Sequence, residues 1–254
     1  YAVVCGSTDG IGKAAAEELA LNGACIVLVA RNKEKLERVL SGLDAKQGQQ
    51  HTYLIADFDD PENLVKVLDE SSAHLENVEI LINNSGGPAG GQAIDANLEE
   101  YYLAFNRHLI CNQILAKKIV PFMEKAGYGR IINIISTSVK APLNGLGVSN
   151  TIRGAVANWS KTLANELGSR GITVNNVLPG ATLTGRLESI IENKAKKLGV
   201  STEEVSNKML SEIPAARFAT ANEVADAVCF LASPSAAYIN GINLPVDGGR
   251  LSCL

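Results

Sequence analysis

The feature that most constrains the fold is a turn with three glycines near the start of the chain. The turn reads Cys5-Gly6-Ser7-Thr8-Asp9-Gly10-Ile11-Gly12, and the short apolar run Tyr1-Ala2-Val3-Val4 precedes it. The segment from Lys13 to Leu21 has the pattern of a helix, with Gly23 placed to end it. A glycine turn between a strand and a helix lets the backbone bend tightly and leaves room for a ligand beside it.

The start of this predicted helix is suited to an anion. Its free backbone amides, together with the helix dipole, favour a phosphate or a diphosphate. We therefore expect the turn to hold the diphosphate of a dinucleotide, through Gly6, Ser7, Thr8, Gly10, Ile11 and Gly12. The alternative is a glycine turn that holds no ligand.

Strand-like and helix-like segments alternate along the rest of the chain. Asn32 and Asp60-Pro61 each begin a predicted helix. Further helices are expected over 98–125, 150–169 and 222–232, and strands over 25–30, 52–56, 78–82, 131–135, 172–178 and 242–246. This alternation predicts an α/β fold, a doubly wound parallel sheet of the Rossmann type with helices on both faces. We expect residues 1–254 to form a single domain.

Composition excludes several classes of protein. With 254 residues, of which 46% are hydrophobic, the chain can bury the core of one such domain. The net charge of −4 and the lack of a basic cluster argue against a nucleic-acid partner, and no apolar run approaches the ~18 residues of a membrane span. The five cysteines are scattered and the three histidines lack metal-ligand spacing. These spacings predict no metal site. No secretory leader opens the printed sequence, so we expect a cytoplasmic protein.

Residues 184–214 interrupt the alternation. This segment is polar, follows the end of a predicted strand, and carries four lysines, Lys194, Lys196, Lys197 and Lys208. Doubly wound sheets bind ligands at the carboxyl ends of their strands, so we expect a mobile lid over the substrate. The alternative is a solvated helical hairpin.

The chemically suggestive clusters all follow the carboxyl ends of predicted strands, which meet along one edge of such a sheet. They include the glycine turn, Asn83-Asn84-Ser85-Gly86, Ser136, and Pro179-Gly180 with Thr184. Asn106 and the closing runs Phe230-Leu231-Ala232-Ser233 and Val246-Asp247-Gly248-Gly249 complete the pattern. On these motifs the chain resembles a short-chain dehydrogenase/reductase over nearly its whole length.

The resemblance implies positions for a nicotinamide cofactor. Asp57 would accept from the adenine amino group, and Phe58 would contact the base. The adenosine side would rest on Asn83, Ser85 and Gly86, and the nicotinamide carboxamide would be held by Pro179, Gly180, Thr182 and Thr184. From the residues alone, the alternatives are that Asp57 caps the next turn and that Asn83 satisfies local backbone groups.

The residues after the second predicted strand indicate the cofactor type. A carboxylate there selects NAD, whereas an arginine accommodates a 2′-phosphate. Here Arg31-Asn32 follows the strand, with no carboxylate before Glu34, and a guanidinium matches phosphate geometry. We therefore expect Arg31 and Asn32 to bind NADP(H), with NAD(H) as the alternative. The alternative is that Arg31 is a solvated loop residue. The negative charge of Asp9 in the glycine turn also argues against NADP(H).

The family's catalytic pair is replaced in this chain. An ordinary member has a Tyr thirteen residues after the catalytic Ser and a Lys four residues later. Counting from Ser136 reaches Ser149 and Arg153. Arg153 keeps the positive charge and has donors for the ribose hydroxyls of the cofactor, but a Ser hydroxyl is a weaker acid than a phenol and has a shorter reach.

Three interpretations of the site follow. In the first, Ser136, Ser149 and a water relayed through Asn106 supply the proton, and Arg153 stabilises the developing oxyanion. In the second, the donor is Lys140 or His108, although His108 fits an interface or core position better. In the third, the chain is a non-catalytic, regulatory dinucleotide-binding module.

We expect an NADP-dependent oxidoreductase that interconverts a carbonyl and an alcohol by hydride transfer. By resemblance, the leading subtype is a 3-oxoacyl thioester reductase acting on a carrier-protein or coenzyme A thioester, and the next is a sugar or polyol dehydrogenase. The lysine-rich segment suits a phosphate-bearing acyl carrier. The resemblance also implies a homotetramer or homodimer built through residues 98–125, 150–169 and the last strand.

Overall fold

The chain forms one parallel sheet with helices on both faces. The computed structural model describes residues 1–253, and within them seven strands pair in the order β3-β2-β1-β4-β5-β6-β7. The strands are β1 (Ala2–Cys5), β2 (Ile26–Ala30), β3 (Thr52–Ile55), β4 (Ile80–Asn83), β5 (Gly129–Ile134), β6 (Ile172–Pro179) and β7 (Asn243–Val246). The predicted doubly wound parallel sheet is confirmed.

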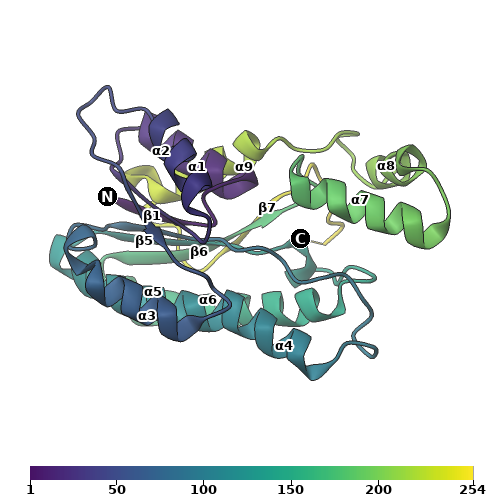
Figure 1. Cartoon of the computed structure of the whole chain (residues 1–254), viewed down its shortest axis with the longest axis horizontal. Coiled ribbons are helices and arrows are strands. Elements are labelled where there is room, and N and C mark those ends of the chain that lie inside the picture. Colours follow the sequence, from purple (N-terminus) through teal and green to yellow (C-terminus); the bar gives the residue numbers. More distant parts are fainter. Residues whose placement is uncertain (254) are drawn as a thin grey trace.

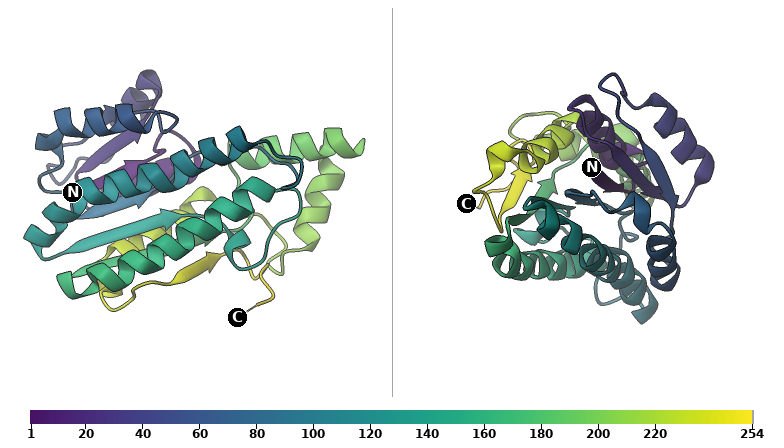
Figure 2. Two further views of the ribbon diagram at one scale, coloured as in Figure 1. Left: turned by 90° about the horizontal axis from the view of Figure 1, so that it is seen from below. Right: turned by 90° about the vertical axis from the view of Figure 1, so that its left-hand side faces the viewer.

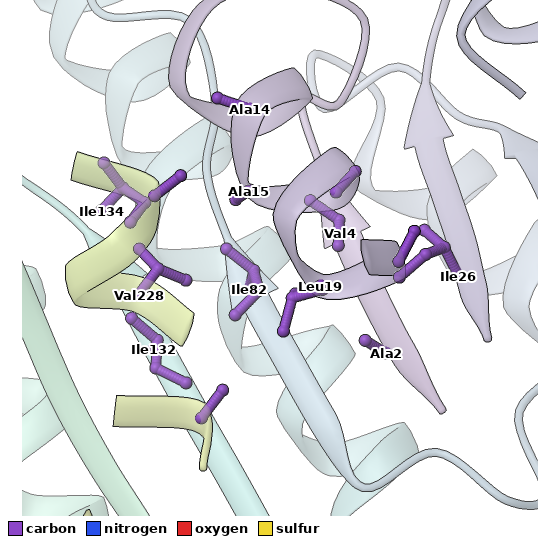
Figure 3. Close-up of a cluster of buried hydrophobic side chains, with 14 of the residues drawn as sticks. Ala2, Val4, Ala14, Ala15, Leu19, Ile26, Ile82, Ile132, Ile134 and Val228 are labelled. Carbon is purple, nitrogen blue, oxygen red and sulfur yellow. The ribbon is translucent and has the colours of Figure 1, made fainter. Parts of the chain in front are cut away.

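Two helical layers enclose the sheet (Figures 1 and 2). One face is covered by α1 (Gly10–Leu21), α2 (Lys33–Gly42) and α9 (Ala221–Ala232). The other is covered by α3 (Pro61–Glu70), α5 (Cys111–Ala126) and α6 (Gly147–Leu167), with α4 (Leu98–Phe105) leading into α5. Figure 3 shows how Leu19 of α1 and Val228 of α9 face Val4, Ile82 and Ile132 of the central strands.

The local signals in the sequence explain where several helices begin. Asn32 caps α2, because its side-chain oxygen accepts from the backbone amide of Lys35 at 2.8 Å. Asp60 caps α3 in the same way through Asn63, at 2.9 Å, with a proline at the first helical position. Such caps satisfy amides that have no partner within the helix, so these two predicted helix starts are confirmed.

The long helix predicted over 98–125 is interrupted. After α4, residues Asn106–Ile110 form a π-helical segment in which the Cys111 amide donates to the carbonyl oxygen of Asn106. The long helical stretch predicted over 98–125 is therefore confirmed, and the π-helical segment within it was not predicted. Hydrophobic spacing cannot distinguish a single wide turn from an α-helical turn, and such turns are frequent at functional sites.

The lysine-rich segment forms a pair of helices at the carboxyl edge of the sheet. Helices α7 (Gly185–Leu198) and α8 (Thr202–Ser211) pack against each other and extend beyond the strands at the right of Figure 1. Backbone pairing between Thr182 and Ala219 ties the two ends of the segment together. The structure of residues 184–214 is thus a helical hairpin, and its action as a lid stays a prediction.

A row of asparagines crosses the sheet from β4 to β7. Asn83, Asn133, Asn176 and Asn243 occupy paired positions on neighbouring strands. In each pair the Nδ2 of one amide donates to the Oδ1 of the next, at 2.8, 2.9 and 2.8 Å. The first three are buried, so these bonds satisfy polar groups that water does not reach. The row joins four strands through their side chains.

Two further properties bear on function. None of the helices within residues 1–253 combines the length and apolar character needed to cross a bilayer. In the same part of the chain, no three potential metal-ligating side chains come together. All five cysteines are unpaired, and Cys5 and Cys111 are buried.

Candidate active site

The glycine turn after β1 requires glycine at three of its positions, Gly6, Gly10 and Gly12. Gly6 and Gly10 have positive φ angles of 58° and 52°. A Cβ on Gly12 would lie 2.2 Å from the carbonyl oxygen of Gly6, far inside any allowed contact. The turn therefore leaves a bare backbone surface at the start of α1. This cradle fits a diphosphate.

Asn84 holds the turn in place from behind. Its side-chain amide donates to the carbonyl oxygens of Cys5 and Gly6, each at 3.3 Å. Asn84 belongs to the predicted run Asn83-Asn84-Ser85-Gly86, but no role was predicted for its own side chain. Its support of the turn depends on β4 lying next to β1.

A cavity of about 190 Å³ opens beside the turn. It is lined by Gly6, Thr8, Val29, Ala30, Arg31, Ala56, Asp57, Phe58, Asn84, Ser85, Gly86 and Arg107. Seven of these are predicted cofactor residues, and the structure brings them together from the ends of β1, β2, β3 and β4. Arg107 was not predicted, because its place in the wall depends on the π-helical segment.

Two arginines and two aspartates at this cavity form a cluster in which the opposite charges balance. Arg107 donates through Nε and Nη2 to both carboxylate oxygens of Asp59. These hydrogen bonds lower the pKa of Asp59 and raise that of Arg107. Arg31 lies at the mouth, 70% exposed, with Nη1 3.8 Å from Asp57 Oδ2 and 4.0 Å from Asp59 Oδ2. Asp57 also accepts from the Asp59 amide at 3.1 Å, so it caps its turn and lines the cavity at once.

Some predicted cofactor residues use their side chains within the protein. Ser7 is buried, and its hydroxyl reaches the carbonyl oxygen of Val29 at 3.5 Å. Asn32 is committed to capping α2, and Asn83 belongs to the asparagine row. Ile11 packs against the core between the sheet and α1. At Ser7 and Ile11 the backbone amides are the groups left for a phosphate.

The predicted nicotinamide segment lies against the glycine turn. Gly180 follows β6, and its amide donates to Val246 at 2.9 Å. Thr182 is buried and donates to the Gly180 carbonyl at 3.2 Å. Thr184 caps α7, and its methyl group would lie 3.0 Å from a Cβ on Gly10. Of the stretch from Pro179 to Thr184, Thr184 therefore lies against the glycine turn.

The predicted catalytic residues come from β5, α6 and the π-helical segment. Ser136 follows β5, and its hydroxyl accepts from the Ser138 amide at 3.1 Å. Ser149 is half-buried in the first turn of α6, and Arg153 lies one turn later on the same face. Arg153 donates to the carbonyl oxygen of Ile134 at 2.9 Å, which places it beside the end of the strand that leads to Ser136. Asn106 is half-buried where the π-helical segment begins.

The Arg153 guanidinium carries its charge in a poorly solvated place. Its side chain is buried, and burial lowers its pKa to about 10, with a further lowering from the positive charge of Arg186. Even so, Arg153 is charged at neutral pH. It can therefore stabilise negative charge that develops near the end of β5.

His108 is a buried, neutral residue. Its Nδ1 lies 2.7 Å from the hydroxyl of Ser85, and its Nε2 is buried without a hydrogen-bond partner. Burial lowers its pKa well below the ordinary value, and the charges of Arg153, Arg107 and Arg186 lower it further. The core position considered for His108 is confirmed, and a neutral imidazole is a weak proton donor. Lys140, the other alternative donor, is exposed just after the turn that follows Ser136.

Known proteins are similar to this chain in sequence and in architecture. The family profile described as enoyl-(acyl carrier protein) reductase matches residues 6–250. The NADPH-dependent reductase BacG of Bacillus subtilis is 30% identical over 254 residues, which is all of this chain and 98% of that protein. The 3-oxoacyl-[acyl-carrier-protein] reductase FabG of Haemophilus influenzae is 34% identical over 98% of this chain and 96% of its own.

A solved structure agrees with these relatives. The L-sorbose reductase of Gluconobacter frateurii, solved with NADPH and L-sorbose, superposes with a TM-score of 0.92 at 32% identity. The match covers 100% of this chain and 97% of that one. Together with the family profile, these similarities show that the chain belongs to the short-chain dehydrogenase/reductase family of oxidoreductases.

Proposed function

We propose that this protein is an NADPH-dependent reductase that interconverts a carbonyl and an alcohol by hydride transfer. The observation that carries the proposal is the bare glycine turn at the end of β1, which has the cavity at Arg31 on one side and Thr184 against Gly10 on the other. A glycine turn at the carboxyl edge of such a sheet suits a dinucleotide. BacG and the L-sorbose reductase, two relatives of the whole chain, are described with NADPH.

Each part of the cofactor has residues suited to it. The amides of the glycine turn would bind the diphosphate, and Arg31 the 2′-phosphate. Asp57 and Phe58 would hold the adenine, with Arg107 as an additional wall of its cavity. Thr182 and Thr184 would orient the nicotinamide, which supplies the hydride when bound. Arg153 has donors left for the nicotinamide ribose after its bond to Ile134.

The proton has to come from groups other than a phenol. Ser136 lies at the end of β5 and Ser149 at the start of α6. We propose that their hydroxyl groups bind the reacting oxygen of the substrate. Asn106 would hold a water that relays a proton toward them, and the wide turn at Asn106 fits a functional position. Arg153 would stabilise the oxygen as it gains negative charge. A neutral His108 does not suit the role of proton donor.

The leading substrate is a 3-oxoacyl thioester. FabG, whose name states this activity, is similar over nearly the whole chain. A sugar or polyol is the next candidate, because the L-sorbose reductase superposes over the whole chain. The hairpin of α7 and α8 would act as the substrate lid, and its lysines would suit a phosphate-bearing carrier.

A second candidate function is a regulatory module that binds the dinucleotide without reacting. The presence of Ser149 and Arg153 where the family has Tyr and Lys favours it, since general acid catalysis contributes about 10² to 10⁴ in rate. In either case we expect a cytoplasmic homotetramer or homodimer. Leu98, Tyr102 and Phe105 form an exposed apolar stripe on α4, which supports an interface there.

Two measurements separate these candidates. Fluorescence titration should show that NADPH binds, and NADPH consumption should follow the addition of a 3-oxoacyl thioester, a diketone or a sugar. Tight binding without turnover in either direction would favour the regulatory module. A protein that binds neither NADPH nor NADH would refute both.

A further inference from the structure

Arg107 and Asp59 form an ion pair with a fixed geometry at the wall of the cofactor cavity. Nε and Nη2 of Arg107 donate to the two carboxylate oxygens of Asp59, so that each oxygen accepts one hydrogen bond. The two side chains are only 25% and 30% exposed. Two-point pairs of this kind are strong and directional. The pair therefore fastens the π-helical segment to the loop after β3.

Arg31 lies beside this pair and is held much more loosely. Its Nη1 is 3.8 Å from Asp57 Oδ2 and 4.0 Å from Asp59 Oδ2, and both distances exceed that of a hydrogen bond. Its side chain is largely exposed at the mouth of the cavity. An ion pair between exposed groups contributes little to stability, so a bound phosphate can draw the guanidinium away from the two carboxylates.

Asp59 is the group that would oppose a phosphate at Arg31. The ordinary pKa of an aspartate is about 3.9, and the hydrogen bonds from Arg107 lower the pKa of Asp59 further, so its carboxylate is charged at neutral pH. A 2′-phosphate carries about 1.5 to 2 negative charges and would be repelled by a carboxylate beside it. The same carboxylate would compete with the phosphate for the Arg31 guanidinium, which already lies 4.0 Å away.

Arg107 counteracts both effects of Asp59. Because each oxygen of Asp59 accepts a hydrogen bond from Arg107, the carboxylate attracts Arg31 less strongly. The charge of Arg107 also offsets that of Asp59, so the two arginines and two aspartates of the cluster carry no net charge. Without Arg107 the cluster would carry one excess negative charge, at the place where the 2′-phosphate has to bind.

We propose that Arg107 is a positioning residue for cofactor choice: by holding Asp59, it leaves Arg31 free to bind the 2′-phosphate of NADPH. This inference rests on the proposed function, because it concerns the NADPH that this function requires. Arg107 then contributes to the preference for NADPH over NADH without contacting the phosphate. A side chain that served only as a wall for the adenine would affect both cofactors equally, since they share that base.

The test measures the Kd values for NADPH and NADH by fluorescence titration. Calorimetry with 2′,5′-ADP and 5′-AMP makes the same comparison without the nicotinamide. For Arg107→Met we expect the preference for the 2′-phosphate to fall roughly 3- to 10-fold, and no further than in Arg31→Ala, because Arg107 acts through Arg31. Arg107→Lys keeps the charge without the two-point geometry and should lose less of the preference.

A double variant with Asp59→Asn and Arg107→Met removes the opposing carboxylate as well. It should recover most of the wild-type preference, which a merely structural role of Arg107 would not allow. The matched control is Lys118→Met, which breaks the ion pair between Lys118 and Asp69. Lys118 is 27% exposed, close to the value for Arg107, but does not line the cavity. This control should keep the wild-type preference.

The outcomes identify which claim fails. A double variant as impaired as Arg107→Met would overturn the inference, because Arg107 would then contact the phosphate itself. Equal losses of affinity for NADPH and NADH in Arg107→Met would overturn it too. If Arg107→Met does not fold, Asp59→Asn alone decides: a preference at or above that of the wild type supports the inference, and a lower one overturns it. If the wild type binds neither cofactor, the proposed function falls. If the wild type prefers NADPH and Arg107→Met keeps that preference, only this inference falls.

Discussion

Replacing Gly12 with alanine tests whether the glycine turn holds the diphosphate. The new Cβ would lie 2.2 Å from the Gly6 carbonyl oxygen and 2.6 Å from the Asn84 side-chain nitrogen. An ordinary contact is longer than 3.4 Å, so the turn has to move by about 1 Å away from α1. Because Asn84 presses on the same carbonyl from behind, the strain cannot be relieved by a side-chain rotation.

The size of the effect follows from this displacement. Overpacking of this kind costs about 1–3 kcal/mol in stability, which is about 2–12 °C in Tm for a chain of this length. A shift of about 1 Å also breaks at least one hydrogen bond between a backbone amide and a charged phosphate, worth about 1.5–3 kcal/mol. We therefore expect the Kd for NADPH to rise by roughly 10- to 150-fold.

Fluorescence titration with NADPH gives the Kd, and calorimetric unfolding gives the Tm. The matched control is Gly42→Ala at the end of α2, where an added Cβ meets no atom within 4 Å. This control should bind NADPH as the wild type does and gain up to about 1 kcal/mol in stability. A folded Gly12→Ala protein that binds NADPH with wild-type affinity would refute the placement of the diphosphate at this turn.

Three further predictions concern single side chains. Ser149→Ala should slow turnover modestly, while Arg153→Ala should chiefly raise the Kd for NADPH. If steady-state kinetics and titration showed the opposite effects, the roles proposed for these two residues would be wrong. Arg31→Ala should weaken NADPH binding roughly tenfold and leave NADH binding unchanged, as lost contact with a 2′-phosphate requires, whereas equal weakening of both would exclude that contact. The folded state holds the pKa of His108 well below its value of about 6.5 in the unfolded chain. The free energy of unfolding is therefore greatest above about pH 6.5 and falls as the pH drops toward the pKa of the folded state. Unfolding experiments between about pH 8 and pH 5 should show a smaller loss in His108→Gln, but the full loss in a His74→Gln control at an exposed position.

The fold could be predicted because its signals are local. Asn32 and Asp60 each precede an amphipathic segment, and a cap needs only the residues next to it. The glycine turn is similarly contained in eight consecutive residues. The alternation of strands and helices, with chemically suggestive residues after the strands, then predicted that most of the candidate site lies along one edge of the sheet.

The parts that could not be predicted depend on neighbours distant in sequence. Asn84 supports the turn because β4 pairs with β1, and Arg107 lines the cavity from the π-helical segment, where it donates to Asp59 of a distant loop. The wide turn at Asn106 leaves no trace in the hydrophobic spacing of 98–125.

The hydrogen bonds of the asparagine row all run in one direction, so a substitution at one position affects the hydrogen bonding of its neighbours. The amides of Asn83, Asn133 and Asn176 all donate toward β7, while Asn83 Oδ1 at the head of the row has no hydrogen-bond donor. Loss of Asn133 alone would strand a donor on Asn83 and an acceptor on Asn176, at about 1–3 kcal/mol for each. If two neighbouring asparagines change together, fewer hydrogen-bonding groups are left without a partner for each amide that is removed. Drift at one position is therefore opposed until an adjacent position changes too, so we expect these asparagines to be kept or replaced jointly in descendants of this chain.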